Sequence, residues 1–188
     1  EISHFISTPD GIRTPEEDIL ETREASPVEL KGAEKGMNKI EFVKFKDDGA
    51  GIFKSEKGEV SREGEERFEF YRRERAAYLV SRFFGFDLVP PTTIREINGN
   101  VGSVQEYIPD ASIARKLETE EFQDVAVDLG AEGLKMRIFD CLIWNWDRHN
   151  GNFLVKDREI YAIDNGISFS TRFNSFRNPT ERFEKEFI

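Results

Sequence analysis

Two aspartates and one asparagine in the last third of the chain have the residue types and spacing needed for phosphoryl transfer. Asn152 follows Asp147 by five positions, and Asp164 comes twelve positions later, where it begins an Asp-x-Gly turn. Carboxylate and amide oxygens are the hard ligands that Mg²⁺ prefers, so Asn152 and Asp164 are candidate metal ligands. A second carboxylate, that of Asp147, could then orient an attacking hydroxyl group. The three residues together predict metal-assisted transfer of a phosphoryl group to an alcohol.

Two upstream residues stand in the order that protein kinases use. Lys54 ends a predicted strand over residues 51–54, where a kinase places the lysine that neutralises nucleotide phosphates. Glu74 lies on the following predicted helix, on a face with apolar residues, and is the candidate ion-pair partner of Lys54. Gly32 and Gly36 fall between the first two predicted strands, where small residues let backbone amides approach phosphate.

The elements that must position these residues change in type along the chain. In the first half, Thr14 and Pro15 predict the start of a short helix to Arg23, and Asn98-Gly99 predicts a hairpin turn. The other predicted elements of this half are an alternating strand at 39–45, a helix at 62–85 that ends on Gly85, and hairpin strands at 92–97 and 101–108.

The second half is predicted to be rich in helix. Helices are expected at 119–129 and 131–145, followed by a hairpin with strands at 153–155 and 160–163. These elements predict an α+β fold with an N-terminal segment at 1–27, a strand-rich lobe at 28–108 and a reduced helical lobe at 109–188.

Three sequence blocks resemble the atypical kinase group that includes the phosphatidylinositol 3- and 4-kinase-like, HipA-type and secretory-pathway casein kinase families. The blocks are Gly51-Ile52-Phe53-Lys54; Arg73-Glu74-Arg75-Ala76-Ala77-Tyr78 through Leu88-Val89-Pro90-Pro91-Thr92; and Asp147-Arg148-His149 with Asp164-Asn165-Gly166. The resemblance covers residues 28–169 and implies a two-lobed protein-kinase-like fold.

The same resemblance implies roles for individual residues. Asp147 is expected to be the catalytic aspartate, and Asn152 and Asp164 are expected to bind Mg²⁺ or Mn²⁺. Lys54 and Glu74 would form the ion pair beside the phosphates of ATP. Gln105, Glu106 and Tyr107 fall where the group places its interlobe hinge, so they are expected beside adenine.

The chain departs from the group because only about twenty residues follow Asp164-Asn165-Gly166. It is therefore either a minimal kinase or an incomplete one. A protein Ser/Thr kinase is the favoured function, with a phosphatidylinositol or small-alcohol kinase and a catalytically inactive nucleotide- or partner-binding module as alternatives. Candidate sites of self-phosphorylation follow the metal motif at Ser168, Ser170, Thr171, Ser175 and Thr180.

Composition restricts the partners and the compartment that we expect. The formal net charge of -10 disfavours nucleic acid and anionic lipid surfaces, since both require clustered basic residues. A single cysteine prevents an internal disulfide, and no stretch near twenty apolar residues is present, which favours a cytoplasmic protein without membrane insertion. The chain does not begin with Met, so a removed signal sequence remains an alternative.

Overall fold

The computed structural model describes residues 6–8, 11–28, 40–46, 49–59, 69–117 and 130–169. The chain divides into two compact units, one made of residues 1–75 with 90–107 and the other of residues 76–89 with 108–188. Antiparallel sheets and helices occur in both units, so the predicted α+β class is confirmed. Among these residues, no helix has the length and apolar character required to cross a membrane. The predicted ranges of the N-terminal segment and the two lobes stay a prediction.

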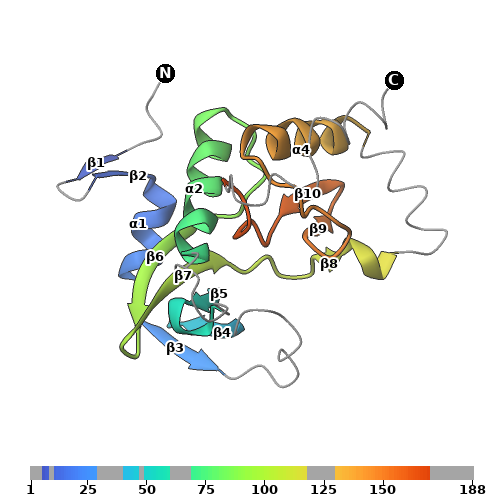
Figure 1. The fold of residues 1–188 in the computed structure, drawn as a ribbon. Coiled ribbons are helices and arrows are strands. Elements are labelled where there is room, and N and C mark those ends of the chain that lie inside the picture. Colours follow the sequence, from blue (N-terminus) through green and yellow to red (C-terminus); the bar gives the residue numbers. More distant parts are fainter. Residues whose placement is uncertain are drawn as a thin grey trace, which may run out of the picture. The chain divides into compact units, whose positions relative to one another are not determined.

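A five-stranded antiparallel sheet is the centre of the first unit (Figure 1). Its strands, in spatial order, are β3 (Ala25–Val28), β4 (Ile40–Phe45), β5 (Ala50–Ser55), β7 (Asn100–Glu106) and β6 (Thr92–Ile97). One apolar cluster packs against this sheet and consists of Leu20, Val43, Phe45, Phe53, Ile97 and Val104. Residues 43 and 45, two positions apart on β4, both belong to it, as the alternating pattern at 39–45 predicts.

The predicted turn at Asn98-Gly99 is confirmed. Asn98 and Gly99 have φ angles of 51° and 73°, and Ile97 pairs with Asn100 across the two-residue turn. Both residues tolerate the left-handed region that such a hairpin requires. The second strand of the hairpin ends at Glu106, two residues earlier than predicted.

The short N-terminal helix is also confirmed, as α1 (Pro15–Thr22), with Thr14 as its N-cap and Pro15 in its first turn. Preceding it, β1 (Ile6–Thr8) and β2 (Gly11–Arg13) form a two-stranded antiparallel sheet. A capping box adds to the cap, because Glu17 reaches back to the backbone of Thr14. The N-terminal segment thus contains folded elements of its own.

The helix that carries Glu74 is α2 (Phe70–Phe83), so the continuous helix predicted from Arg62 is interrupted just before Phe70, and residues 60–68 lie outside the described part of the chain. Glu69 has a φ angle of 50°, in the left-handed region, so a right-handed helix cannot continue through it. The helix ends at Phe83, two residues before the predicted end, and Gly85 follows it with a φ angle of 67°. Between β5 and α2, the 3-10 turn η1 covers Glu56–Gly58.

The second unit contains the remainder of α2, the helix α4 (Gly130–Leu142) and a three-stranded antiparallel sheet. The sheet order is β10 (Glu159–Ala162), β9 (Phe153–Lys156) and β8 (Ser112–Ile113), and the 3-10 turn η2 (Ala114–Leu117) follows β8. The predicted hairpin of β9 and β10 is confirmed, whereas no sequence pattern indicated β8.

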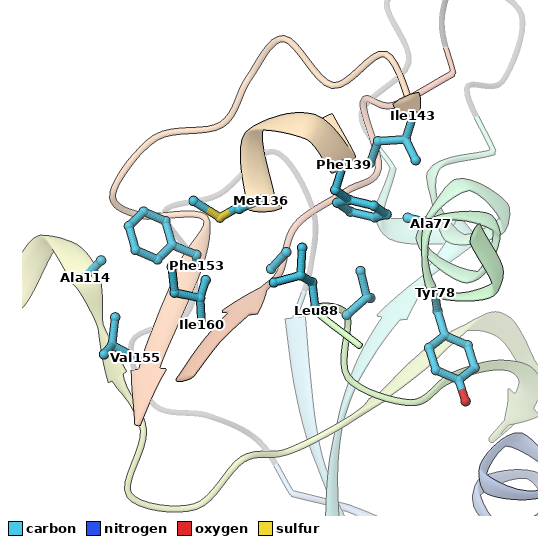
Figure 2. Packing of buried hydrophobic residues seen from close by; sticks show 12 residues of the cluster. Ala77, Tyr78, Leu88, Ala114, Met136, Phe139, Ile143, Phe153, Val155 and Ile160 are labelled. Atoms are coloured by element: carbon cyan, nitrogen blue, oxygen red, sulfur yellow. The ribbon is translucent and has the colours of Figure 1, made fainter. Parts of the chain in front are cut away.

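In the described part of this second unit, the core lies between α2, α4 and the sheet (Figure 2). Ala77 and Tyr78 of α2, Met136 and Phe139 of α4, and sheet residues including Phe153 belong to one buried cluster. The predicted helix at 119–129 falls outside the residues that the structure describes. α4 ends at Leu142, three residues earlier than predicted, and Trp144 then takes a φ angle of 56°.

Candidate functional site

Lys54 and Glu74, both in the first unit, form the ion pair that the sequence predicts. The Lys54 Nζ lies 2.5 Å from the Glu74 Oε1, and the two side chains are 12% and 3% exposed. Lys54 lies on β5, where it pairs with Ser103 of the neighbouring strand, and Glu74 lies in the first part of α2. Since both charges are largely withdrawn from water, each depends on the other, and removing one would leave the other poorly solvated.

The three residues predicted beside adenine lie at the end of β7. Gln105 is buried, and its amide nitrogen donates to the Thr92 hydroxyl at 3.1 Å. The backbone N–H of Glu106 donates to the Pro91 carbonyl at 2.8 Å, and that of Tyr107 donates to the Ala50 carbonyl at 3.0 Å. Because these two N–H groups are already bonded, recognition of a base through either would require breaking a bond of the sheet.

Two other features of Glu106 and Tyr107 would affect the binding of a ligand. Tyr107 is 42% exposed, and its ring makes an edge contact with that of Phe42, at 5.1 Å between ring centres. Burial raises the pKa of Glu106, while the nearby Arg23 acts in the opposite direction. Gly32 and Gly36, predicted to approach phosphate, lie outside the described residues.

In the second unit, the loop between α4 and β9 brings Asp147 and Asn152 together. The Asn152 Nδ2 donates to the Asp147 backbone carbonyl at 3.0 Å, and the Asp147 N–H donates to the Asn145 Oδ1 at 3.1 Å. Both bonds use backbone atoms of Asp147, so its carboxylate is not consumed by them. Since the amide nitrogen of buried Asn152 is held by a carbonyl, the amide oxygen is the atom that remains to ligate a cation.

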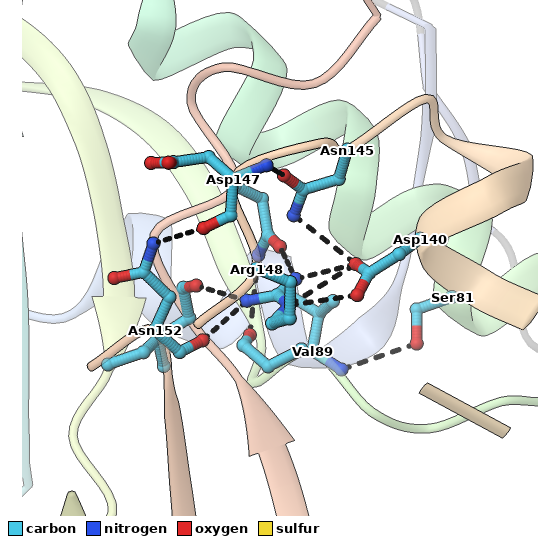
Figure 3. A network of polar contacts seen from close by, with 10 residues as sticks. Ser81, Val89, Asp140, Asn145, Asp147, Arg148 and Asn152 are labelled. Atoms are coloured by element: carbon cyan, nitrogen blue, oxygen red, sulfur yellow. Dashed lines mark hydrogen bonds and ion pairs between the residues drawn. The ribbon is translucent and has the colours of Figure 1, made fainter. Parts of the chain in front are cut away.

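Arg148 ties this loop to the turn that contains Asp164 (Figure 3). Its guanidinium donates to both carboxylate oxygens of Asp140 on α4, at 2.9 to 3.2 Å. It also donates to the backbone carbonyl of Asn152, to that of Ile163 at 2.7 Å, and to the Asn165 Oδ1 at 2.6 Å. One buried side chain therefore holds a helix, the loop and the turn in register, which uses the fixed fork geometry of arginine.

Asp164 opens its turn directly after β10 and has a φ angle of 57°. The backbone N–H of Ile163 donates to the Asn152 carbonyl at 3.1 Å. This bond joins the backbone of one predicted metal ligand, Asn152, to the residue directly before the other, Asp164. Asp164 is exposed, and aspartate tolerates this left-handed conformation better than most residues.

The carboxylates of Asp147 and Asp164 interact electrostatically. Burial is the main cause that raises the pKa of Asp147 above 3.8, and the negative charge of Asp164 raises it further. His149 and Arg148 favour the ionised form and oppose this shift. A cation bound at Asp164 would offset this repulsion.

We expect Asp164→Asn to lower the pKa of Asp147 in the metal-free protein, because it removes the repelling charge and keeps a side chain that tolerates a positive φ. Carbon-13 NMR titration of the aspartate carboxyl groups measures the effect. Asp157→Asn is the matched control, since Asp157 is also exposed and has a φ angle of 52°. An Asp147 pKa that does not move in Asp164→Asn would show that the two carboxylates are not coupled.

The donor set of this loop and turn fits Mg²⁺ or Mn²⁺. Mg²⁺ is commonly held by one or two carboxylates, with waters and substrate phosphates completing its shell, and here the donors are the amide oxygen of Asn152 and the carboxylate of Asp164. Within the described part of the chain, no cluster of three or more His, Cys, Asp or Glu side chains could hold a metal by itself.

Sequence reasoning missed Asp140, Asn145 and Asn165 as supports of this site. Asn145 donates to Asp140, and Asn165 is fully buried and accepts from Arg148. A signal for Asp140 was present, because a charged residue inside the apolar run 138–143 must find a buried partner. The sequence could not say that the partner is Arg148.

No protein-family model matches the chain. The chain is similar to "Protein Rv2133c" of Mycobacterium tuberculosis, with 29% identity over a 125-residue alignment that covers 50% of this chain and 45% of the relative. The match thus takes in less than half of the relative's length, and the relative's name states no activity.

Proposed function

We propose that this chain is the catalytic core of an atypical kinase, with a two-lobed protein-kinase-like fold, that transfers a phosphoryl group from metal-bound ATP to a Ser or Thr hydroxyl of a protein. The observation that carries the proposal is the pairing of Asp147 and Asn152 in one loop, with the carboxylate of Asp164 close enough to raise the Asp147 pKa. The Lys54–Glu74 ion pair of the first unit supports it independently.

The residues divide the work of the reaction among them. Asp147 accepts a hydrogen bond from the acceptor hydroxyl, orients it and receives its proton. Asn152, through its amide oxygen, and Asp164, through its carboxylate, would hold the cation. A bound Mg²⁺ or Mn²⁺ neutralises charge on the phosphates. Lys54, kept in place by Glu74, supplies a further positive charge to them.

A protein substrate is favoured over a lipid by charge. The chain has a formal net charge of -10, which would repel an anionic membrane surface. A phosphatidylinositol substrate would have to be drawn to the site against this repulsion.

We expect Asp164→Asn to weaken metal-dependent ATP binding at least about tenfold, because it removes the carboxylate that ligates the cation. Asparagine keeps the tolerance for a positive φ, so the turn should persist. Titration calorimetry with ATP in the presence and absence of Mg²⁺ measures the loss, and Asp157→Asn again serves as control. Equal affinity for metal-ATP in the wild type and in Asp164→Asn would contradict the metal assignment.

A further inference from the structure

Helix α1 is fixed at both ends within the first unit. At its start, the Glu17 N–H donates to the Thr14 hydroxyl at 3.2 Å, and the Thr14 N–H donates to the Glu17 Oε2 at 2.9 Å. At its end, the Arg95 guanidinium from β6 donates to the carbonyls of Leu20 and Arg23, at 2.7 and 2.8 Å. Leu20 is buried in the apolar cluster of the sheet, so α1 is a firm part of this unit.

The carboxylate that caps α1 also binds α2. Glu17 is fully buried, and its second oxygen, Oε1, accepts from the Arg75 Nε at 2.6 Å. The two oxygens of Glu17 therefore have different partners, the cap on one side and Arg75 on the other. Because Glu17 has no exposed surface, its charge depends on this guanidinium rather than on water.

Arg75 is the residue directly after Glu74. On a helix, successive residues point about 100° apart, so Glu74 and Arg75 leave α2 in different directions. Glu74 is bound to Lys54 of β5, and Arg75 is bound to Glu17 of α1. The first turns of α2 are thus held by two ion pairs on different sides, and a rotation that weakens one pair must strain the other.

We propose that Glu17 and Arg75 are positioning residues, whose ion pair holds α2 in the rotation that keeps Glu74 on Lys54. Any effect of this pair on ATP binding rests on the proposed function, in which Lys54 is the phosphate-binding lysine. The geometric claim is that the Glu17–Arg75 ion pair controls the Lys54–Glu74 ion pair. This claim concerns the unliganded chain and does not depend on the proposed function.

The test is the chemical reactivity of the Lys54 amine in the unliganded protein. In Arg75→Met, which keeps an unbranched apolar stem and removes the charge, we expect acylation of Lys54 by an amine-reactive reagent to become about tenfold faster. Peptide mass spectrometry gives the rate, and the exposed Lys44 of β4 is an internal reference. Arg75→Lys, which retains the cation, should stay within about threefold of the wild type.

The matched control is Arg82→Met, which breaks a different ion pair of α2, that of Arg82 with Asp87 at 2.5 Å. It should leave Lys54 acylation unchanged. Hydrogen exchange of the β5 amides separates positioning from general loosening, because a change of rotation leaves this strand protected and unfolding does not. If Arg75→Met does not fold, Glu17→Gln replaces it, since an amide cannot accept from both Thr14 and Arg75 through separate oxygens.

Two results would overturn the proposal. One is wild-type acylation of Lys54 in both Arg75→Met and Glu17→Gln, and the other is faster acylation that appears only together with faster exchange in β5. Steady-state kinetics then separates the two proposals. If the kinase function holds, Arg75→Met should raise the KM for ATP more than it lowers kcat. If no ATP binding is found in any form of the protein, the kinase proposal fails while the acylation result still decides the role of Arg75.

Discussion

Replacing Asp147 with Asn is expected to lower phosphoryl transfer by at least about a hundredfold while metal-ATP affinity stays within about threefold of the wild type. Asparagine is nearly isosteric with aspartate but cannot accept the proton of the acceptor hydroxyl. The hydrogen bonds of Asp147 with Asn145 and Asn152 use its backbone N–H and carbonyl, so the loop should keep its geometry.

Calorimetry measures the affinity for metal-ATP, and rapid-quench experiments with enzyme in excess measure a single turnover. The control is Asp157→Asn, which makes the same substitution at an exposed turn outside the site. A parallel loss of affinity and rate in Asp147→Asn would assign this residue to metal binding instead of catalysis.

The second large effect is expected at Arg148, on stability. Arg148→Met should destabilise the second unit by about 3 to 5 kcal/mol, because it removes the cation that compensates the buried Asp140 carboxylate. It also removes the donors to the carbonyls of Asn152 and Ile163. The double variant Arg148→Met with Asp140→Leu should recover part of the loss, since it no longer buries a charge without its partner.

Urea unfolding followed by tryptophan fluorescence measures this loss in the second unit, because both tryptophans, Trp144 and Trp146, lie in the loop beside Arg148. Arg115→Met is the control, since Arg115 is exposed. A loss below about 1 kcal/mol in Arg148→Met, the range of an exposed ion pair, would show that Arg148 does not hold the loop as described.

The elements that sequence patterns predicted well are those with local causes. The cap of α1 follows from Thr14 and Pro15, and the β6–β7 hairpin follows from Asn98-Gly99, because each depends on the conformations of a few neighbouring residues. The interruption before α2 could not be predicted in this way, since nothing in the residue type of Glu69 indicates a φ angle of 50°. The strand β8 has only two residues and is defined by its partner β9.

The candidate site shows the same division between local and long-range causes. Sequence spacing was enough to select Asp147 with Asn152 and Lys54 with Glu74 as pairs, and the structure joins the members of each pair by a hydrogen bond. The supports of these pairs could not be predicted. The bond from Arg148 to Asn165 spans 17 positions and that from Arg75 to Glu17 spans 58, and no local pattern encodes such partners.

Self-phosphorylation can be sought only at some of the predicted acceptors. Ser168 is fully buried, so its hydroxyl is a poor acceptor while the second unit is folded. Ser170, Thr171, Ser175 and Thr180 lie outside the described residues. An assay of the whole protein is therefore preferable to one aimed at a single hydroxyl.

Incubation of the purified chain with ATP labelled in its terminal phosphate, in Mg²⁺ or Mn²⁺, tests the kinase proposal most directly. The label is followed into the chain, into acidic and basic protein substrates, and into inorganic phosphate. We predict metal-dependent transfer by the wild type that Asp147→Asn reduces at least about a hundredfold. If the wild type binds metal-ATP but neither labels any protein nor releases phosphate faster than Asp147→Asn does, the chain is a nucleotide-binding module and not a kinase.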